Sequence, residues 1–334
     1  MEASLFDYEL PEEFIAQEPV EPRDASRLLV VHRATGELEH RHFYDLPHYL
    51  QAGDTLVLND TRVSARRLFG RKPTGGRVEL LLLRPLGDGR WHALVRPGRR
   101  LPEGSHILLD KGHTAQIEAR LEGGIRLVRF TPPDDEWLQQ VGQIPLPPYI
   151  HRQLTDPERY QTVYAQSPGS AAAPTAGLHF TPQLLERLKA QGVQIATVTL
   201  HVSLDTFRPL QSERVEEHKM HGEWFTLSPE AAEVINQTRG RIVAVGTTCV
   251  RVLESAAVGK RRVQPTTGET QLYITPGYEF KVVEALITNF HAPRTTVLVL
   301  VCAFAGRELI LNAYQEAIRR RYRFLSFGDA MLIL

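Results

Sequence analysis

Hydrophobic and polar positions follow helical and strand periods in turn along the second half of the chain. Thr181 is a good N-cap that precedes a proline and an apolar helical stripe, and VQIATVTLHV follows as a strand. Ser228 begins a second such unit, in which the helical run EAAEVINQTR leads to the short apolar strand RIVAVG. TTCVRVLESAA and ELILNAYQEAIRRRYRF are further predicted helices. This alternation is typical of an α/β layered fold.

Between residues 62 and 150 the pattern changes to short strand-like runs. RVELLLLRPL, RWHALVRP and IRLVRF are separated by the glycine-rich turns TGG, GDG and EGG, and no helical period interrupts them. The pattern predicts a small antiparallel β-barrel or sandwich. We therefore expect an α/β domain formed by residues 1–61 and 151–334, with a β domain over residues 62–150 inserted into it.

The apolar runs and the cysteines favour a cytoplasmic protein. TTVLVLVCAFAG, residues 295–306, is too short for a membrane span and is expected to be a buried strand or another core element. The first residues, MEASLFDYELPEEF, carry acids where a signal peptide needs a basic region. Cys249 and Cys302 lie far apart in the chain, which indicates neither a disulfide framework nor a structural zinc site.

Charged residues are distributed unevenly along the chain. Lys+Arg and Asp+Glu both number 39, so the formal net charge is zero. Residues 2–24 nevertheless hold eight acids and one arginine, whereas residues 62–100 hold eleven Lys or Arg against two acids. The second segment is a candidate basic face of the β domain, as nucleic-acid binding requires.

Common catalytic and binding motifs are absent from the sequence. It holds no G-x-G-x-x-G after a strand, no P-loop and no G-x-S-x-G. EEHKMHGEW places His218 and His221 near glutamates, but H-E-x-x-H is missing and no third soft ligand has useful spacing. We predict no metal site, and the two histidines are assigned either to ligand contact or to plain surface placement.

One stretch of the chain is unusually free of charge. SPGSAAAPTAGLHFTP, residues 167–182, contains no acid, lysine or arginine. Its small side chains would let backbone N–H groups approach a ligand, and the helix that begins beyond it adds partial positive charge. The stretch therefore predicts a neutral, tight pocket; the alternative is a buried connector between domains.

The same stretch resembles the signature of a known enzyme family, and other blocks resemble that family in the same order. They are FDYELPEEFIAQEPVEPRDASRLLV, LVLNDTRVSARRLFG, IPLPPYI, ERYQTVYA, EHKMHGEW, VGTTCVRVLES, TPGYEFKVVEALITNFHAPRTT and FGDAML, and the agreement runs from Phe6 to Leu334. The chain is similar to the S-adenosylmethionine:tRNA ribosyltransferase-isomerases of the queuosine pathway. The resemblance implies an α/β domain formed by both chain ends with an inserted small antiparallel β-barrel.

The resemblance also implies an activity. The enzyme would transfer and isomerise the ribosyl part of S-adenosylmethionine onto 7-aminomethyl-7-deazaguanine (preQ1) in the tRNA anticodon loop, giving epoxyqueuosine-tRNA, adenine and methionine. S-adenosylmethionine is then a consumed substrate and no cofactor is implied. We expect a monomer whose partners are this tRNA and S-adenosylmethionine. Another S-adenosylmethionine-dependent tRNA-modifying enzyme, such as a methyltransferase, and a non-catalytic tRNA-binding protein are the alternatives.

The chain departs from the family pattern in two blocks. TLHVSLDTF has Ser203 and Asp205 where the family usually has glycines, and glycine commonly marks close backbone approach or a positive φ. GTTCVRVLES has Cys249 where serine is more usual. The loop with Ser203 and Asp205 is therefore expected to differ locally.

The implied reaction needs a base that removes a proton beside the sulfonium, and a pocket that excludes water. His179, in the uncharged stretch, is the first candidate, and hydrogen bonding to the loop backbone is its alternative role. His201 and His291 follow strand-like runs, where α/β domains place ligand sites, and either could take its place. Asp60 is a further candidate, to orient a cationic group or a substrate amine.

The remaining candidates are expected to bind substrates, with turn, cap and solvated-surface roles as the alternatives. Hydroxyl and N–H groups at a helix start suit a carboxylate or ribose, and a tyrosine can stack on a base. Substrate contacts are predicted for Asn59, Arg62, Ser170, Thr175, Gly177, Thr247, Thr248, Arg251, Tyr278 and Asn289. Contacts to tRNA are predicted for Arg66, Arg67, Arg71, Lys72, Arg96, Arg99 and Arg100, and a second basic patch for Arg319, Arg320, Arg321 and Arg323.

Overall fold

The computed structural model describes residues 1–203, 209–210, 212–220 and 222–334, so Asp205 and His221 lie outside the described residues. The chain divides into two compact units. The first comprises Met1–Thr61, Pro147–Ser167 and Ala173–Leu334, and the second comprises Arg62–Leu146 and Pro168–Ala172. The sequence predicted one domain formed by residues 1–61 and 151–334 and a second formed by residues 62–150. These domain limits remain a prediction.

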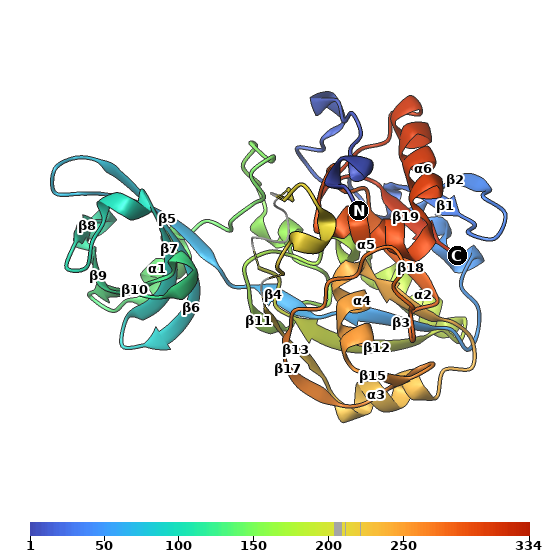
Figure 1. Cartoon of the computed structure of the whole chain (residues 1–334). Coiled ribbons are helices and arrows are strands. Elements are labelled where there is room, and N and C mark those ends of the chain that lie inside the picture. The colour runs from blue at the N-terminus through green and yellow to red at the C-terminus, as the bar shows by residue number, and fades with distance from the viewer. Residues whose placement is uncertain (204–208, 211, 221) are drawn as a thin grey trace. The chain divides into compact units, whose positions relative to one another are not determined.

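A nine-stranded mixed sheet organises the first unit, in the order β17-β13-β12-β3-β14-β18-β19-β1-β2. Its strands are β1 (Arg27–Val31), β2 (Leu38–His42), β3 (Thr55–Asn59), β12 (Gln194–Leu200), β13 (Glu223–Leu227), β14 (Ile242–Val245), β17 (Thr266–Thr270), β18 (Ala285–Asn289) and β19 (Ala330–Ile333). β12, β3, β14 and β18 run parallel to one another, whereas β13 and β19, which flank this group, pair antiparallel with β12 and β18. β1 pairs with β19, so the two chain ends meet in one sheet, as Figure 1 shows in blue and red. This confirms the predicted α/β fold built from both ends.

Helices cover the sheet because its central strands are apolar on both faces. α2 (Pro182–Ala190) begins at its N-cap Thr181, as predicted, and its leucines pack with Leu56 and Leu58 of β3. Val57, between them, faces the opposite side. The other helices are α3 (Pro229–Asn236), α4 (Gly246–Ser255), which packs on β3, β12, β14 and β18, α5 (Thr296–Ala305) and α6 (Arg307–Arg319).

Shorter elements complete this unit. Its 3-10 helices are η1 (Ala3–Phe6), η2 (Glu12–Phe14), η3 (Arg23–Ala25), η4 (Phe43–His48), η8 (Pro157–Tyr160), η9 (Thr175–His179) and η11 (Val215–Glu217). β15 (Ala257–Gly259) and β16 (Arg262–Val263) form a small two-stranded sheet. β4 (Thr61–Val63) and β11 (Ser167–Ser170) each span a limit between the two units.

The apolar run 295–306 is a helix, so its assignment as a strand is wrong, while its assignment to the core is confirmed. Thr295 caps α5 by accepting a hydrogen bond from the N–H of Leu298 (3.3 Å), and Gly306 ends it with φ +92°. A short apolar run fits a buried helix and a buried strand equally well by periodicity. No single described helix is long and apolar enough to cross a membrane, although α5 and α6 pass that test as a pair bent by 113°.

The second unit is a closed barrel of order β10-β7-β6-β5-β8-β9 with antiparallel pairing, as the resemblance implied. Its elements are β5 (Arg66–Arg71), β6 (Arg77–Gly87), β7 (Arg90–Arg96), β8 (His106–Leu108), β9 (Thr114–Arg120), β10 (Arg126–Thr131), α1 (Asp135–Val141), η5 (Gly98–Arg100), η6 (Asp110–Gly112) and η7 (Glu122–Gly124). Inward-facing residues such as Leu68, Leu80 and Ile117 form its core.

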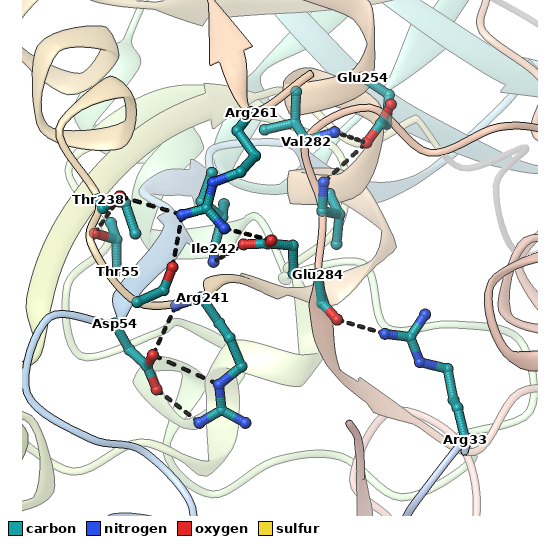
Figure 2. Close-up of polar contacts among 12 residues, drawn as sticks. Arg33, Asp54, Thr55, Thr238, Arg241, Ile242, Glu254, Arg261, Val282 and Glu284 are labelled. Carbon is teal, nitrogen blue, oxygen red and sulfur yellow. Dashed lines mark hydrogen bonds and ion pairs between the residues drawn. The ribbon is translucent and has the colours of Figure 1, made fainter.

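The amino ends of the parallel strands are joined by a network of charged side chains, shown in Figure 2. Asp54, directly before β3, is fully buried and accepts hydrogen bonds from the backbone N–H and from Nη2 of Arg241, both at 2.7 Å. Glu284, directly before β18, accepts from the N–H of Ile242 (3.0 Å) and pairs with Arg261. These charged groups satisfy one another, so removing one partner would leave a poorly compensated charge at this edge of the sheet.

Candidate functional site

The carboxyl ends of the four parallel strands lie side by side at the other edge of the sheet. β12, β3, β14 and β18 are consecutive neighbours there. The chain leaves them at His201, Asp60, Gly246 and Phe290, respectively. Ligands of open α/β sheets bind outside this edge, because the loops that follow adjacent strands converge there.

A neutral pocket occupies this edge. It is lined by Ala173, Pro174, Thr175, Ala176, Val202, Gly246, Thr247, Thr248, Thr288, Asn289, His291 and Val297. The lining residues that the structure describes include no aspartate, glutamate, lysine or arginine, and the volume that they outline is about 30 Å³. The predicted Thr175, Thr247, Thr248, Asn289 and His291 therefore come together, although they are far apart in the sequence.

The start of α4 presents polar groups to this pocket. Gly246, with φ +85°, begins the helix directly after β14, and no side chain caps the first turn. Thr248 is 8% exposed, and its Oγ1 is buried without a hydrogen-bond partner in the described part of the chain. A helix start that no described side chain caps, with a hydroxyl that has no described partner, suits an anionic or hydroxyl-bearing ligand.

The opposite wall of the pocket consists of Ala173 and Pro174 of the uncharged stretch, together with the start of η9. The Thr175 hydroxyl donates to Oδ1 of Asn289 (2.9 Å), which ties the stretch to the end of β18. Gly177 is packed so closely that an added Cβ would lie 2.1 Å from the Tyr164 hydroxyl and 2.8 Å from Cγ2 of Thr162. Only glycine fits there, so the wall is held against the segment that carries Tyr164.

His179 lies behind this wall and is 4% exposed. Its Nε2 accepts a hydrogen bond from Nδ2 of Asn289 (3.2 Å), and its Nδ1 donates to Oγ of Ser26 (2.8 Å). The orientation of the Asn289 amide is set because its Oδ1 already accepts from Thr175. Burial, followed by the charges of Arg159 and other arginines, lowers the His179 pKa to about 3. A neutral ring with both nitrogens engaged favours a positioning role over proton transfer.

His291 lines the pocket itself. Its Nε2 lies 2.8 Å from Oγ1 of Thr288, and its backbone N–H donates to the Tyr314 hydroxyl (2.9 Å). Burial lowers the His291 pKa to about 4, so the ring is neutral near pH 7. Within the described residues its Nδ1 has no hydrogen-bond partner, and this nitrogen can accept a proton in the tautomer whose Nε2–H donates to Thr288.

His201 and Asp60 lie at neighbouring strand ends. Nδ1 of His201 is 2.8 Å from Oγ1 of Thr61, and its ring stacks on Trp224 with centroids 4.9 Å apart. Burial lowers the His201 pKa, while Asp60 raises it. Asp60 accepts a hydrogen bond at Oδ1 from the Thr199 hydroxyl (2.6 Å). Each side chain is thus oriented by a threonine.

Three predicted substrate-binding residues make contacts within the protein. The Asn59 side chain donates to the carbonyl of Leu200 and accepts from its N–H, both at 3.0 Å, and so joins β3 to β12. Arg251 is 5% exposed and pairs with Glu223. The Tyr278 hydroxyl donates to Glu254 (3.2 Å). These contacts stabilise the unit, and substrate contact by these residues stays a prediction.

Arg62 and Ser170 belong to the second unit, and the Ser170 hydroxyl donates to the Ala172 carbonyl (2.6 Å).

The residues predicted to contact tRNA differ in exposure. In the barrel, Arg71, Arg96, Arg99 and Arg100 are exposed, whereas Arg66, Arg67 and Lys72 are partly buried. The second basic patch is only partly neutralised: Arg319 and Arg320 share the Glu316 carboxylate (2.7 and 2.9 Å), and Arg321 pairs with Glu13 (3.5 Å). Arg323 donates to the Glu18 carbonyl.

Ser203 and Cys249, two of the three positions that depart from the family pattern, are described by the structure. The Ser203 N–H donates to Oε1 of Glu223 (2.7 Å), and Asp205 is outside the described residues. Cys249 is fully buried in α4. Among the described residues no three His, Cys, Asp or Glu side chains are grouped so that they could hold a metal ion.

Sequence reasoning missed the partners that hold the candidate histidines. Ser26 orients His179, and Thr288, with no exposed surface, orients His291. The Tyr164 hydroxyl, which packs on Gly177, is buried and has no partner within the described chain. Thr288 directly precedes Asn289 at the end of a strand, so its place in the sequence could have indicated a role at the site. Ser26 and Tyr164 become neighbours of the site only through the tertiary fold.

Comparisons with known proteins agree over the whole chain. The family model described as "Queuosine biosynthesis protein" matches residues 3–333. The chain is 54% identical over 345 residues to the S-adenosylmethionine:tRNA ribosyltransferase-isomerase of Moorella thermoacetica, with 100% of both chains covered. It is 56% identical over 341 residues to the protein of that name from Symbiobacterium thermophilum, again with 100% of both covered.

A crystal structure of similar sequence supports the same assignment. The S-adenosylmethionine tRNA ribosyltransferase of Thermotoga maritima matches with a TM-score of 0.57 and 44% identity, over 99% of this chain and 100% of that one. A family model that covers nearly every residue, with relatives more than half identical, confirms the resemblance found in the sequence blocks. The chain belongs to the queuosine biosynthesis protein family.

Proposed function

We propose that this protein is an S-adenosylmethionine:tRNA ribosyltransferase-isomerase. It transfers and isomerises the ribosyl part of S-adenosylmethionine onto preQ1 in the tRNA anticodon loop, giving epoxyqueuosine-tRNA, adenine and methionine. The full-length relatives of that name support this assignment. The structural observation that carries it is the uncharged pocket at the carboxyl edge of the parallel strands, next to the uncapped start of α4.

The residues that line the pocket offer groups that match parts of S-adenosylmethionine, although the space of about 30 Å³ that they outline is smaller than the whole ligand. The free N–H groups of the first turn of α4 would hold the carboxylate, and the unpaired Thr248 hydroxyl would hydrogen-bond a ribose or carboxylate oxygen. Among the described residues of the lining there is no anionic side chain that would form a fixed ion pair with the sulfonium. A sulfonium already activates the neighbouring carbons, so its reactivity does not depend on an added cofactor.

We assign proton abstraction to Nδ1 of His291, because this histidine lines the pocket and is neutral near pH 7. Thr288 would fix the ring by its contact with Nε2. His201 is the second candidate, oriented by Thr61 and close to Asp60. His179, the first candidate by sequence, would hold Asn289 in place. Asp60 would orient a cationic substrate group.

The decisive experiment incubates the full-length protein with S-adenosylmethionine and tRNA carrying preQ1. Release of free adenine and methionine, with mass gain on the tRNA, supports the proposal. Formation of S-adenosylhomocysteine would indicate a methyltransferase instead. Tight tRNA binding without any turnover would indicate a tRNA-binding protein.

A histidine series then assigns the base. His291→Gln is expected to lower kcat at least about 100-fold, the usual range for loss of a general base. His201→Gln should have a smaller effect. Near-normal adenine release by His291→Gln would refute the assignment to His291 while leaving the activity itself intact.

We further propose that the protein acts as a monomer in the cytoplasm, where its tRNA substrate is found. Arg66, Arg67, Arg71, Lys72, Arg96, Arg99 and Arg100 would contact tRNA phosphates. Sedimentation velocity at micromolar concentration, with and without tRNA, checks the monomer. A stable dimer without tRNA would contradict it.

A further inference from the structure

We propose that a groove on the outer face of the barrel binds an unpaired RNA nucleotide, with its base stacked on Phe69 and its phosphates on Arg71, Lys72 and Arg77. The inference deepens the proposed function and rests on it, since tRNA is the proposed substrate. It adds a base-stacking position to a surface for which the sequence predicted only phosphate contacts.

Strand alternation places Phe69 on the outside of the barrel. In β5, Leu68 is 3% exposed and belongs to the barrel core, whereas Phe69 is 58% exposed. A single exposed apolar side chain is common, whereas an exposed apolar patch rimmed by polar residues marks an interaction site. Leu108 of β8, also among the groove residues, is 48% exposed, so the apolar surface extends beyond one side chain.

The ring is held on a rigid support. An added Cβ at Gly70 would lie 2.7 Å from Cγ2 of Ile107 and 2.8 Å from the Leu108 carbonyl oxygen. β5 is therefore pressed directly against β8, where Arg71 pairs in register with Leu108. This contact fixes the floor of the groove, whose volume is about 530 Å³ and which Phe69 and Leu108 both line. That space is large enough for a nucleotide.

The charges around the groove suit a polyanion. Arg71, Lys72 and Arg77 line it with one acid, Asp110. Arg71 and Arg77 are opposite each other in the β5–β6 register, and neither makes an ion pair with any described residue. Two unpaired arginines at one position repel each other, which destabilises the pair unless an anion lies between them.

The surrounding surface extends this charge. Lys72 donates from Nζ to the Arg100 carbonyl (2.7 Å), which holds the exposed Arg99 and Arg100 beside the groove. Arg67, on the same strand, differs because Glu79 neutralises it at 3.0 Å. The free cations therefore cluster at the end of β5 that carries the groove.

An exposed aromatic ring among unpaired cations is the arrangement that binds single-stranded nucleic acid, because every base has a face that can stack. A second copy of this chain is a poor occupant. A two-fold contact through this face would bring the same unpaired arginines of both copies together.

The test measures tRNA binding by the full-length protein at several salt concentrations. Phe69→Ala should raise the Kd about 10-fold, within the usual loss for a stacked base, without changing the salt slope. Phe69→Trp should keep the Kd within about twofold, because stacking is retained.

The phosphate contacts are tested separately. Arg71→Ala should reduce the slope of log K against log salt by about 1. Leu86→Ala, at another exposed leucine of the barrel (45% exposed), is the matched control and should change neither.

A spectroscopic readout reports stacking directly. An anticodon stem-loop with 2-aminopurine at successive unpaired positions should be quenched at one position by the wild type and by Phe69→Trp, and not by Phe69→Ala. Wild-type binding with an unchanged Kd for Phe69→Ala would overturn the stacking site alone. No tRNA binding by the wild type would overturn the proposed function as well. A dimer that Phe69→Ala dissociates, with tRNA binding unchanged, would assign the groove to a second copy and overturn the inference.

Discussion

Nδ2 of Asn289 donates a hydrogen bond to Nε2 of His179 across 3.2 Å, and so links the end of β18 to the uncharged stretch. The same amide accepts from Thr175 on the pocket wall (2.9 Å) and donates to the Leu325 carbonyl (3.3 Å). One side chain thus joins a strand end, the pocket wall and a buried imidazole. The arrangement fixes His179 in its Nδ1–H tautomer and holds the wall at a set distance from the sheet.

The buried His179 is expected to make stability depend on acid. Its pKa is about 3 in the folded protein against 6.5 for an ordinary histidine, so the unfolded chain binds the proton more tightly. Its contribution is complete above pH 6.5 and is lost as the pH falls toward 3. Between pH 6.5 and about pH 5 it should remove about 2 kcal/mol from the free energy of unfolding.

Urea unfolding at pH 7.5, pH 6.5 and about pH 5 measures this loss. His179→Gln should be less stable than the wild type at pH 7.5 but should lose less stability on acidification. His151→Gln, at an exposed histidine, serves as the control and should follow the wild type. An identical pH dependence for His179→Gln and wild type would show that the ring is accessible to protons.

Gly177→Ala is expected to destabilise the protein by about 1 to 3 kcal/mol, because its Cβ would overlap the Tyr164 hydroxyl at 2.1 Å. Thermal or urea unfolding gives the value. Gly259→Ala, where an added Cβ meets nothing within 4 Å, should change stability by less than about 0.5 kcal/mol. Tyr164→Phe in the Gly177→Ala background should recover part of the loss; no coupling between the two sites would contradict the packing described.

Thr248→Val should separate stability from ligand binding. The Oγ1 of Thr248 is buried without a partner among the described residues, so replacing it by a methyl group should raise the free energy of unfolding by about 1 kcal/mol. The same change should weaken S-adenosylmethionine binding about 2- to 10-fold, because one hydrogen bond to the ligand is lost. Calorimetric titration and urea unfolding check the two effects. Unchanged affinity would remove Thr248 from the substrate site.

Asp54→Ala should destabilise the protein by about 3 to 5 kcal/mol, because it leaves Arg241 without its buried carboxylate. Asp54→Asn, which keeps an oxygen for the Arg241 N–H, should cost less. In the folded fraction, kcat should stay near the wild-type value, since this edge is opposite the pocket. A large fall in kcat with little loss of stability would contradict a purely structural role for this edge.

Local sequence determined the elements whose signals are short-range. Thr181 and Ser228 cap α2 and α3 as predicted, since an N-cap hydroxyl accepts from an N–H three residues away. The β runs with glycine turns between residues 62 and 150 predicted the antiparallel module, because hairpin pairing joins neighbouring segments. Its closure into a barrel followed from the family resemblance. The apolar run that became α5 was ambiguous, because burial on all sides hides the period.

The sequence by itself determined the family, most of the element types and an uncharged loop before α2, because these depend on residue identity and local periodicity. The tertiary structure decided which groups meet. It buried His179 against Ser26 and Asn289, brought His291 and Thr248 to one pocket, and turned Asn59 and Arg251 toward protein partners. Strand order causes this difference: the parallel strands align the ends of segments far apart in the chain, and spacing along one chain does not encode that proximity.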